Sequence, residues 1–194
     1  MVIATPESGP SFSEALFGRL FELAAAESDD PRTKNAALVE DKEGRWCCWQ
    51  TNRLPRGLAP HSPEELELWL QSPTKYDYLG HAEENCCLEA ARQGVPLAGG
   101  SMWALWAPCP VCARAIIGTG LKRLTTLAPL QRATPARWSA KVLLGLQLCR
   151  RVGVEVVLYQ PRLGHLQVPR SWRFDGKSWN KILEILAELE RCDD

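Results

Sequence analysis

The sequence has no apolar run long enough to cross a membrane. A membrane-spanning helix needs roughly 20 consecutive apolar residues, and no stretch approaches that length. The segment from Met1 to Phe12 also lacks the basic cluster followed by an apolar run that marks a secretory signal. We therefore expect a soluble, cytoplasmic protein that does not associate with membranes.

The sequence also lacks net charge, because 23 Lys and Arg residues balance 23 Asp and Glu residues. Proteins that bind nucleic acid are usually basic, so the balance disfavours nucleic acid as a partner. The charge is unevenly distributed, however: from Gly120 to Arg173, ten Lys and Arg residues stand against one acid, Glu155. This stretch is either a solvated surface neutralised by neighbouring acids or a surface that attracts phosphates.

Histidine is scarce, with 3 residues, whereas 8 cysteines are present. Without a secretion signal, the cysteines indicate metal binding or core packing rather than disulfides. The adjacent pairs at 47–48 and 86–87 lie in apolar segments, which favours a place in the core. Cys109 and Cys112, in contrast, have the spacing of metal ligands.

Helical periodicity and short apolar runs alternate along the 194 residues, which fit one domain without internal repeats. The expected strands span 36–39, 45–51, 101–106, 123–127 and 154–159, and the first two form a hairpin. The expected helices span 13–26, 62–71, 81–93, 110 to about 118, 135–152 and 177–191. This alternation predicts an α/β sandwich with a partly parallel sheet.

Two short motifs carry the chemistry: His81-Ala82-Glu83 precedes Pro108-Cys109-Pro110-Val111-Cys112 by about 25 residues. A catalytic zinc takes three protein ligands and leaves a fourth position for water. Cys109 and Cys112 lie three apart at a helix start, so both sulfurs can face one point, and the helix dipole there favours thiolates. His81 and Glu83 also open a helix, where the chain can aim both into one pocket.

A lone Cys-x-x-Cys could be a redox pair, but the conjunction of both motifs indicates metal chemistry. A purely structural zinc would need a fourth protein ligand, and neither His61 nor His165 has suitable spacing. His-x-Glu followed by Pro-Cys-x-x-Cys is the signature of zinc-dependent deaminases of nucleobases. We therefore expect one zinc ion and hydrolytic deamination of a cytosine ring, with Glu83 moving the protons.

Longer segments extend this similarity from about Phe17 to Tyr159. They read DPRTKNAALV, TNRLPRG, KYDYLGHAEENCCLEAARQGVPLAGGSMWALWAPCPVCARAIIGTGLKRL, PARW and VGVEVVLY. The sequence resembles deoxycytidylate deaminases of bacterial and phage type, within the cytidine deaminase superfamily. The resemblance implies a three-layer α/β/α sandwich with a mixed five-stranded sheet and a homo-oligomer. It also implies a single deaminase domain over 1–194, with a core at about 14–160 and a closing helix at about 177–191.

The resemblance also implies roles for individual residues. His81, Cys109 and Cys112 would bind zinc, and Glu83 would be the proton shuttle. The backbone of Ala82 would contact the cytosine carbonyl, Asn52 would hold the sugar, and the loop of residues 52–57 would seat the 5′-phosphate through Arg56. Asn35 and Pro108 are further candidate substrate contacts.

The expected substrate is dCMP, which would yield dUMP and ammonia. Residues 128–131 (Ala-Pro-Leu-Gln) depart from the acidic or aromatic residues of many members, which leaves base and sugar selectivity open. The segment 57–78 lacks the Cys/His set of members with a second zinc. The alternatives are 5-methyl-dCMP, CMP, dCTP or a free nucleoside, a nucleic-acid deaminase, and an inactive zinc-stabilised regulator. The intact Glu83 argues against the last.

Overall fold

A computed structural model describes residues 10–192 of the chain. Most of the segment from Met1 to Phe12, in which no secretory signal is expected, therefore lies outside the described residues. Within them, no helix is long and apolar enough to cross a membrane.

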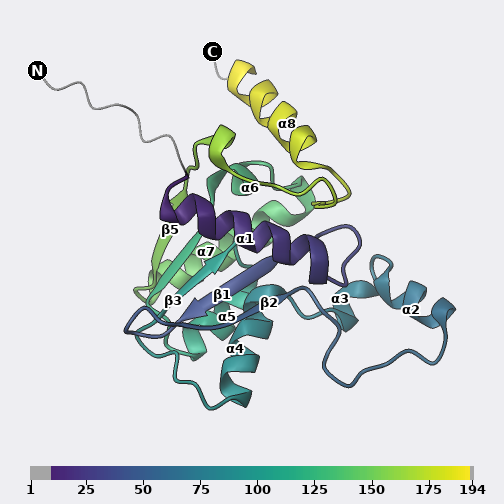
Figure 1. Cartoon of the computed structure of the whole chain (residues 1–194), viewed down its shortest axis with the longest axis vertical. Coiled ribbons are helices and arrows are strands. Elements are labelled where there is room, and N and C mark those ends of the chain that lie inside the picture. The colour runs from purple at the N-terminus through teal and green to yellow at the C-terminus, as the bar shows by residue number, and fades with distance from the viewer. Residues whose placement is uncertain (1–9, 193–194) are drawn as a thin grey trace, which may run out of the picture.

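The centre of the fold is a five-stranded sheet in the order β2-β1-β3-β4-β5 (Figure 1). Its strands are β1 (Ala36–Glu40), β2 (Trp46–Thr51), β3 (Ser101–Ala104), β4 (Arg123–Leu127) and β5 (Glu155–Tyr159). Strand β1 pairs antiparallel with β2 and with β3, whereas β3, β4 and β5 run parallel. The predicted hairpin and the predicted mixed five-stranded sheet are both confirmed.

Helices cover both faces of this sheet. They are α1 (Phe12–Glu27), α2 (Pro63–Leu70), α3 (Lys75–Tyr78), α4 (Ala82–Arg92), α5 (Pro110–Gly118), α6 (Ala128–Arg132), α7 (Ala136–Arg151) and α8 (Trp179–Cys192), and a 3₁₀ turn spans Leu163–His165. Strand β1 shows why both faces are covered: Ala36 and Leu38 belong to the core under α1, and Ala37 and Val39 to the core under α4 and α5. Alternate side chains of a strand point to opposite faces, so the fold is a three-layer α/β/α sandwich.

Two short helices were not predicted. Helix α3 has four residues and α6 has five, too few for a helical periodicity to show. Helix α6 contains Pro129 in its first turn, and Leu130 is fully buried in the core under α1. The unusual stretch 128–131 therefore contributes to packing on that face.

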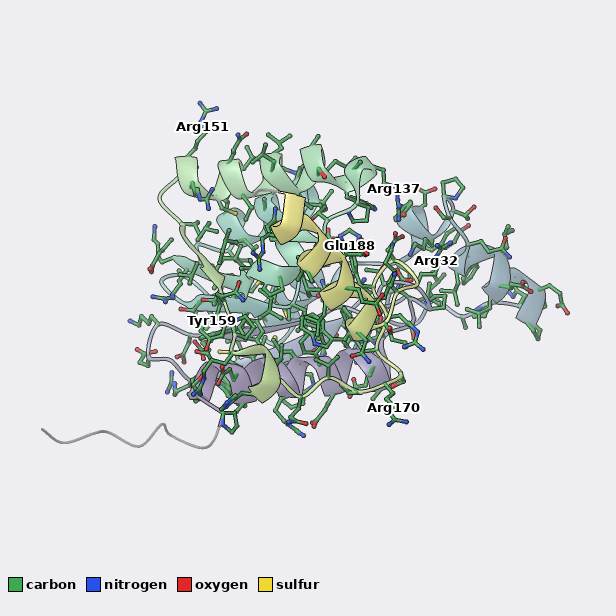
Figure 2. The ribbon with its side chains drawn as sticks, turned by 90° about the horizontal axis from the view of Figure 1, so that it is seen from above. Arg32, Arg137, Arg151, Tyr159, Arg170 and Glu188 are labelled. Atoms are coloured by element: carbon green, nitrogen blue, oxygen red, sulfur yellow. The ribbon has the colours of Figure 1, made fainter. Side chains whose placement is uncertain are left out.

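The chain beyond β5 returns across the α1 face of the sheet before α8 begins. The indole Nε1 of Trp172 donates to the carbonyl of Lys34 at 2.7 Å, and the Lys34 amide donates to the carbonyl of Arg173 at 2.8 Å. Figure 2 follows this path through the labelled Tyr159, Arg170 and Glu188. The returning segment is thereby tied to the loop that leads into β1, and Phe174 and Asp175 are carried to the end of the sheet where α4, α5 and α7 begin.

Candidate active site

The two helix starts predicted from the sequence meet at one place. His81 is the N-cap residue of α4 and Cys109 is the N-cap residue of α5, with Pro110 in the first helical position. Proline suits that position because its missing N–H has no partner there in any helix. Cys112 lies one turn inside α5, so its sulfur faces the same point as that of Cys109.

The ligand atoms of these three residues have the spacing of a tetrahedral metal site. The Nδ1 atom of His81 lies 3.5 Å from the Sγ atoms of both Cys109 and Cys112, and the two sulfurs are 3.6 Å apart. Tetrahedral zinc, about 2.3 Å from sulfur and about 2.0–2.1 Å from nitrogen, would place the sulfurs about 3.8 Å apart and nitrogen about 3.5 Å from each. The group therefore fits zinc with three protein ligands.

The protonation of the three side chains also suits a cation. The hydrogen bond between the two cysteine side chains, together with the contact with His81, lowers the pKa of Cys109 to about 3. The same bond and burial raise the pKa of Cys112 well above its usual range. Burial opposes the charged form of His81, yet its contacts with Cys109 and Glu83 raise its pKa to about 9. Cys109 therefore has the thiolate form that a metal ion binds, and a metal ion at this site would require Cys112 and His81 to lose a proton.

The structure has a pocket that is lined by His81 and Cys109, and the buried side chain of Glu83 lines it as well. Burial is the main cause that raises the pKa of its carboxyl to about 7. The Nδ2 atom of Asn35 donates to Glu83 Oε2 at 3.0 Å. The Oδ1 atom of Asn35 is buried and has no hydrogen-bond partner among residues 10–192, so the pocket offers an acceptor for a donor on a ligand.

Asn52 and Ala82 lie together at the start of α4. The amide of Ala82 donates to Asn52 Oδ1 at 2.9 Å, and Asn52 Nδ2 donates to the carbonyl of Thr33 at 2.9 Å. Asn52 lines the pocket, and both polar atoms of its side chain form hydrogen bonds with backbone groups of neighbouring segments. The helix that carries His81 and Glu83 is thereby fixed to the loop before β1.

Pro108 is buried immediately before the two cysteines. A Cβ atom on Gly145 of α7 would lie 2.0 Å from the Pro108 carbonyl oxygen and 3.0 Å from the Cys109 carbonyl carbon. Only glycine allows α7 to approach this backbone so closely. An isolated glycine inside a helical pattern is the sequence signal that could have revealed the contact.

The walls of the pocket come mainly from residues that the sequence analysis did not single out. Trp106 and Phe174 stack with ring centroids 3.8 Å apart, and Trp138 packs edge-on against Tyr76 and His81. The space, including its open mouth, is about 580 Å³, within the usual range for small-molecule sites. Besides Glu83 and the three candidate zinc ligands, which we call the metal cluster, its charged lining residues are Asp30, Lys75, Arg137 and Asp175.

The structure does not bring Arg56 to this pocket. Its guanidinium bonds Glu89 at 3.1 Å, and its side chain is 72% exposed. It lines a separate surface groove that contains none of the three metal-cluster residues. Leu130 and Gln131 also lie outside the residues that line the pocket.

Comparison with known proteins places the chain in a family. The model described as "Cytidine and deoxycytidylate deaminase zinc-binding region" matches residues 12–128. The chain belongs to this family. An uncharacterized deaminase of Aliivibrio fischeri is 32% identical over 142 residues, covering 72% of this chain and 88% of that protein. Members of the family are hydrolytic deaminases, as both motifs predicted.

Two phage deoxycytidylate deaminases are also similar to this chain. The deoxycytidylate deaminase of Enterobacteria phage T4 is 36% identical over 108 residues, covering 56% of this chain and 47% of that enzyme. The fold is similar to that of the dCMP deaminase from cyanophage S-TIM5, solved in complex with dCMP and dUMP. That structure has a TM-score of 0.55 and 20% identity, and the match covers 81% of this chain and 99% of that chain.

The contact between Gly145 and the cysteine loop can be tested by Gly145→Ala. We expect a loss of about 1 to 3 kcal/mol in the free energy of unfolding, because the added methyl group must displace backbone, together with weaker metal binding. Gly118→Ala is the matched control, since no atom of residues 10–192 lies within 4 Å of a Cβ there. Denaturant unfolding and zinc titration of both variants measure the effect. Equal stability of the two variants would contradict the close approach.

Proposed function

We propose that this protein is a zinc-dependent deaminase of a cytosine nucleotide and that it converts dCMP and water to dUMP and ammonia. The observation that carries the proposal is the convergence of His81, Cys109 and Cys112 at zinc-like spacing, with buried Glu83 beside them in one pocket. Membership of the deaminase family supports the chemistry, and the names of the phage relatives support the nucleotide.

His81, Cys109 and Cys112 would hold one zinc per chain. The chemistry that zinc supplies in such a site is a lowered pKa for water, from about 16 towards 7. Three protein ligands are the number found in catalytic zinc sites, whereas structural zinc sites have four.

Glu83 is the proposed proton shuttle. With a pKa raised to about 7, its carboxyl can both take and give a proton near neutral pH. It would accept one proton from the water that attacks the carbon bearing the amino group and deliver it to the ring nitrogen. It would then carry the second proton of that oxygen to the amino group, and the bond from carbon to nitrogen would break as ammonia leaves. Asn35, bonded to Glu83 Oε2, orients the carboxylate, and its free Oδ1 would accept a hydrogen bond from the substrate.

The aromatic walls suit a planar base with an attached sugar. Trp106, Phe174, Tyr76 and Trp138 exclude water on several sides, which strengthens polar interactions inside the pocket. Asn52, Ala82 and Pro108 act here mainly by fixing the starts of α4 and α5 around the base. Association into a homo-oligomer remains a prediction. Light scattering would test it by measuring the molar mass of the protein in solution.

The metal ligands are tested by Cys112→Ala. We expect loss of zinc and of stability, because two protein ligands hold the ion poorly and the start of α5 loses its anchor. Cys149→Ala, a fully buried cysteine in α7, is the control: it should lose packing energy but keep zinc. Elemental analysis should give one zinc per wild-type chain. Retention of one full zinc by Cys112→Ala would refute the ligand set.

The proton shuttle is tested by Glu83→Gln. We expect kcat to fall by at least about 10² to 10⁴-fold while zinc and fold remain, since glutamine is isosteric but cannot exchange the proton. Glu84→Gln changes the neighbouring carboxylate, which does not line the pocket, and should keep wild-type kcat. Near-normal turnover by Glu83→Gln would remove Glu83 from the reaction.

The substrate is tested by initial rates at equal concentrations of dCMP, 5-methyl-dCMP, CMP, dCTP, deoxycytidine and single-stranded DNA. We expect dCMP to be used best and single-stranded DNA not to be used. A clear preference for another nucleotide would mean that the zinc chemistry is right and the pocket is built for a different substrate. No release of ammonia from any of them, by a protein loaded with zinc, would contradict the proposed function.

A further inference from the structure

Arg137 and Asp175 line the pocket, and together with Lys177, which lies beside Asp175 but outside the lining, they carry one positive charge in excess. Arg137 bonds Asp175, and Lys177 Nζ lies 3.0 Å from Asp175 Oδ2. These three side chains, two cations and one anion, form what we call the mouth cluster. Lys75 and Asp30, which also line the pocket, form a buried ion pair at 2.6 Å, and the net charge of this pair is zero. A negatively charged part of a ligand is therefore best balanced at the mouth cluster.

We propose that Arg137 is the residue that selects a phosphorylated substrate, by binding the 5′-phosphate of the cytosine nucleotide. This inference rests on the proposed function for the identity of the ligand. It assigns the phosphate to the first turn of α7 and to no residue of the 52–57 loop.

Asp175 need not be left unpaired when the phosphate binds. Arg137 bonds Asp175 through Oδ1, whereas Lys177 uses Oδ2, so Asp175 keeps Lys177 if Arg137 turns towards a ligand. The first turn of α7 contains no acidic side chain. The Arg137 side chain is 57% exposed, so moving its guanidinium costs little desolvation, and its planar fork matches two phosphate oxygens.

The acid in the cluster is held in a fixed place. Asp175 and Gly176 both have positive φ, at 50° and 77°, and form the tip of a turn closed by two hydrogen bonds between Phe174 and Lys177. The Gly176 amide donates to the Arg32 carbonyl at 3.0 Å. The turn thus places Phe174 on Trp106 inside the pocket and Asp175 at the rim. Arg137, which bonds Asp175, lines the pocket together with Trp138.

The test compares Arg137→Gln with Arg151→Gln. Arg151 is the matched control because it is an exposed arginine at the opposite end of the same helix (Figure 2). We expect Arg137→Gln to lower the ratio of kcat/KM for dCMP to that for deoxycytidine by about ten- to a hundredfold, as loss of a charged hydrogen bond does. Arg151→Gln should keep the wild-type ratio. An equal loss on both substrates in Arg137→Gln would overturn the proposal.

Two further variants sharpen the assignment. Asp175→Asn removes the competing charge, and asparagine tolerates the positive φ, so dUMP should bind about two- to fivefold more tightly. Weaker binding would contradict the role of Asp175 as a competing counter-ion.

Arg56→Gln tests the 52–57 loop. A loss of the dCMP preference in this variant, with no loss in Arg137→Gln, would place the phosphate at Arg56.

Binding without turnover separates this inference from the proposed function. Tryptophan fluorescence can follow titration of wild type and Arg137→Gln with dUMP and with inorganic phosphate. If no cytosine compound is deaminated, the proposed function has failed, yet binding of inorganic phosphate that weakens in Arg137→Gln would still support the anion site. The same affinity in wild type and Arg137→Gln would overturn it.

Discussion

Two helices, α4 and α5, begin side by side at one end of the sheet, and the candidate site depends on that meeting. A helix start is the one place where residues two apart, such as His81 and Glu83, can face one pocket, because the N-cap residue is not yet helical. Neighbouring residues hold the starts of both helices in place. Asn52 holds the amide of Ala82, and the glycine of α7 lets that helix press on the carbonyl of Pro108.

This arrangement places ionisable groups where burial opposes their charge. The pKa of Glu83 is raised mainly by burial, and the pKa of Cys112 is raised by its hydrogen bond with Cys109 and by burial. Such perturbed groups gathered in one cleft are costly for stability and are typical of catalytic sites. A divalent cation held by two thiolates and a neutral imidazole would remove most of that cost locally. Zinc at the candidate site would thus link the chemistry of this end of the sheet to its stability.

The elements that carry the chemistry could be predicted because their signals are local. His81, Cys109 and Pro110 mark helix starts by residue type and position alone, and the strands of the parallel half are short apolar runs. The pocket wall could not be predicted in this way. Phe174 is far in sequence from its stacking partner Trp106, and no periodicity reports such a contact. The predicted contact of Arg56 with the 5′-phosphate came from the family resemblance only. In the structure, Arg56 forms an ion pair with Glu89.

The pocket therefore has two parts of different origin. The metal cluster and Glu83 lie within residues 12–128, the part matched by the family model, whereas the mouth cluster lies beyond it. Similarity to deoxycytidylate deaminases consequently supports the reaction more strongly than the substrate. On the proposal that Arg137 binds the phosphate, substrate choice would follow from the charges of the mouth cluster. One excess cation there, beside an aromatic wall and a neutral buried ion pair, favours a ligand with a single compact anionic group over a neutral nucleoside or a polyanionic strand.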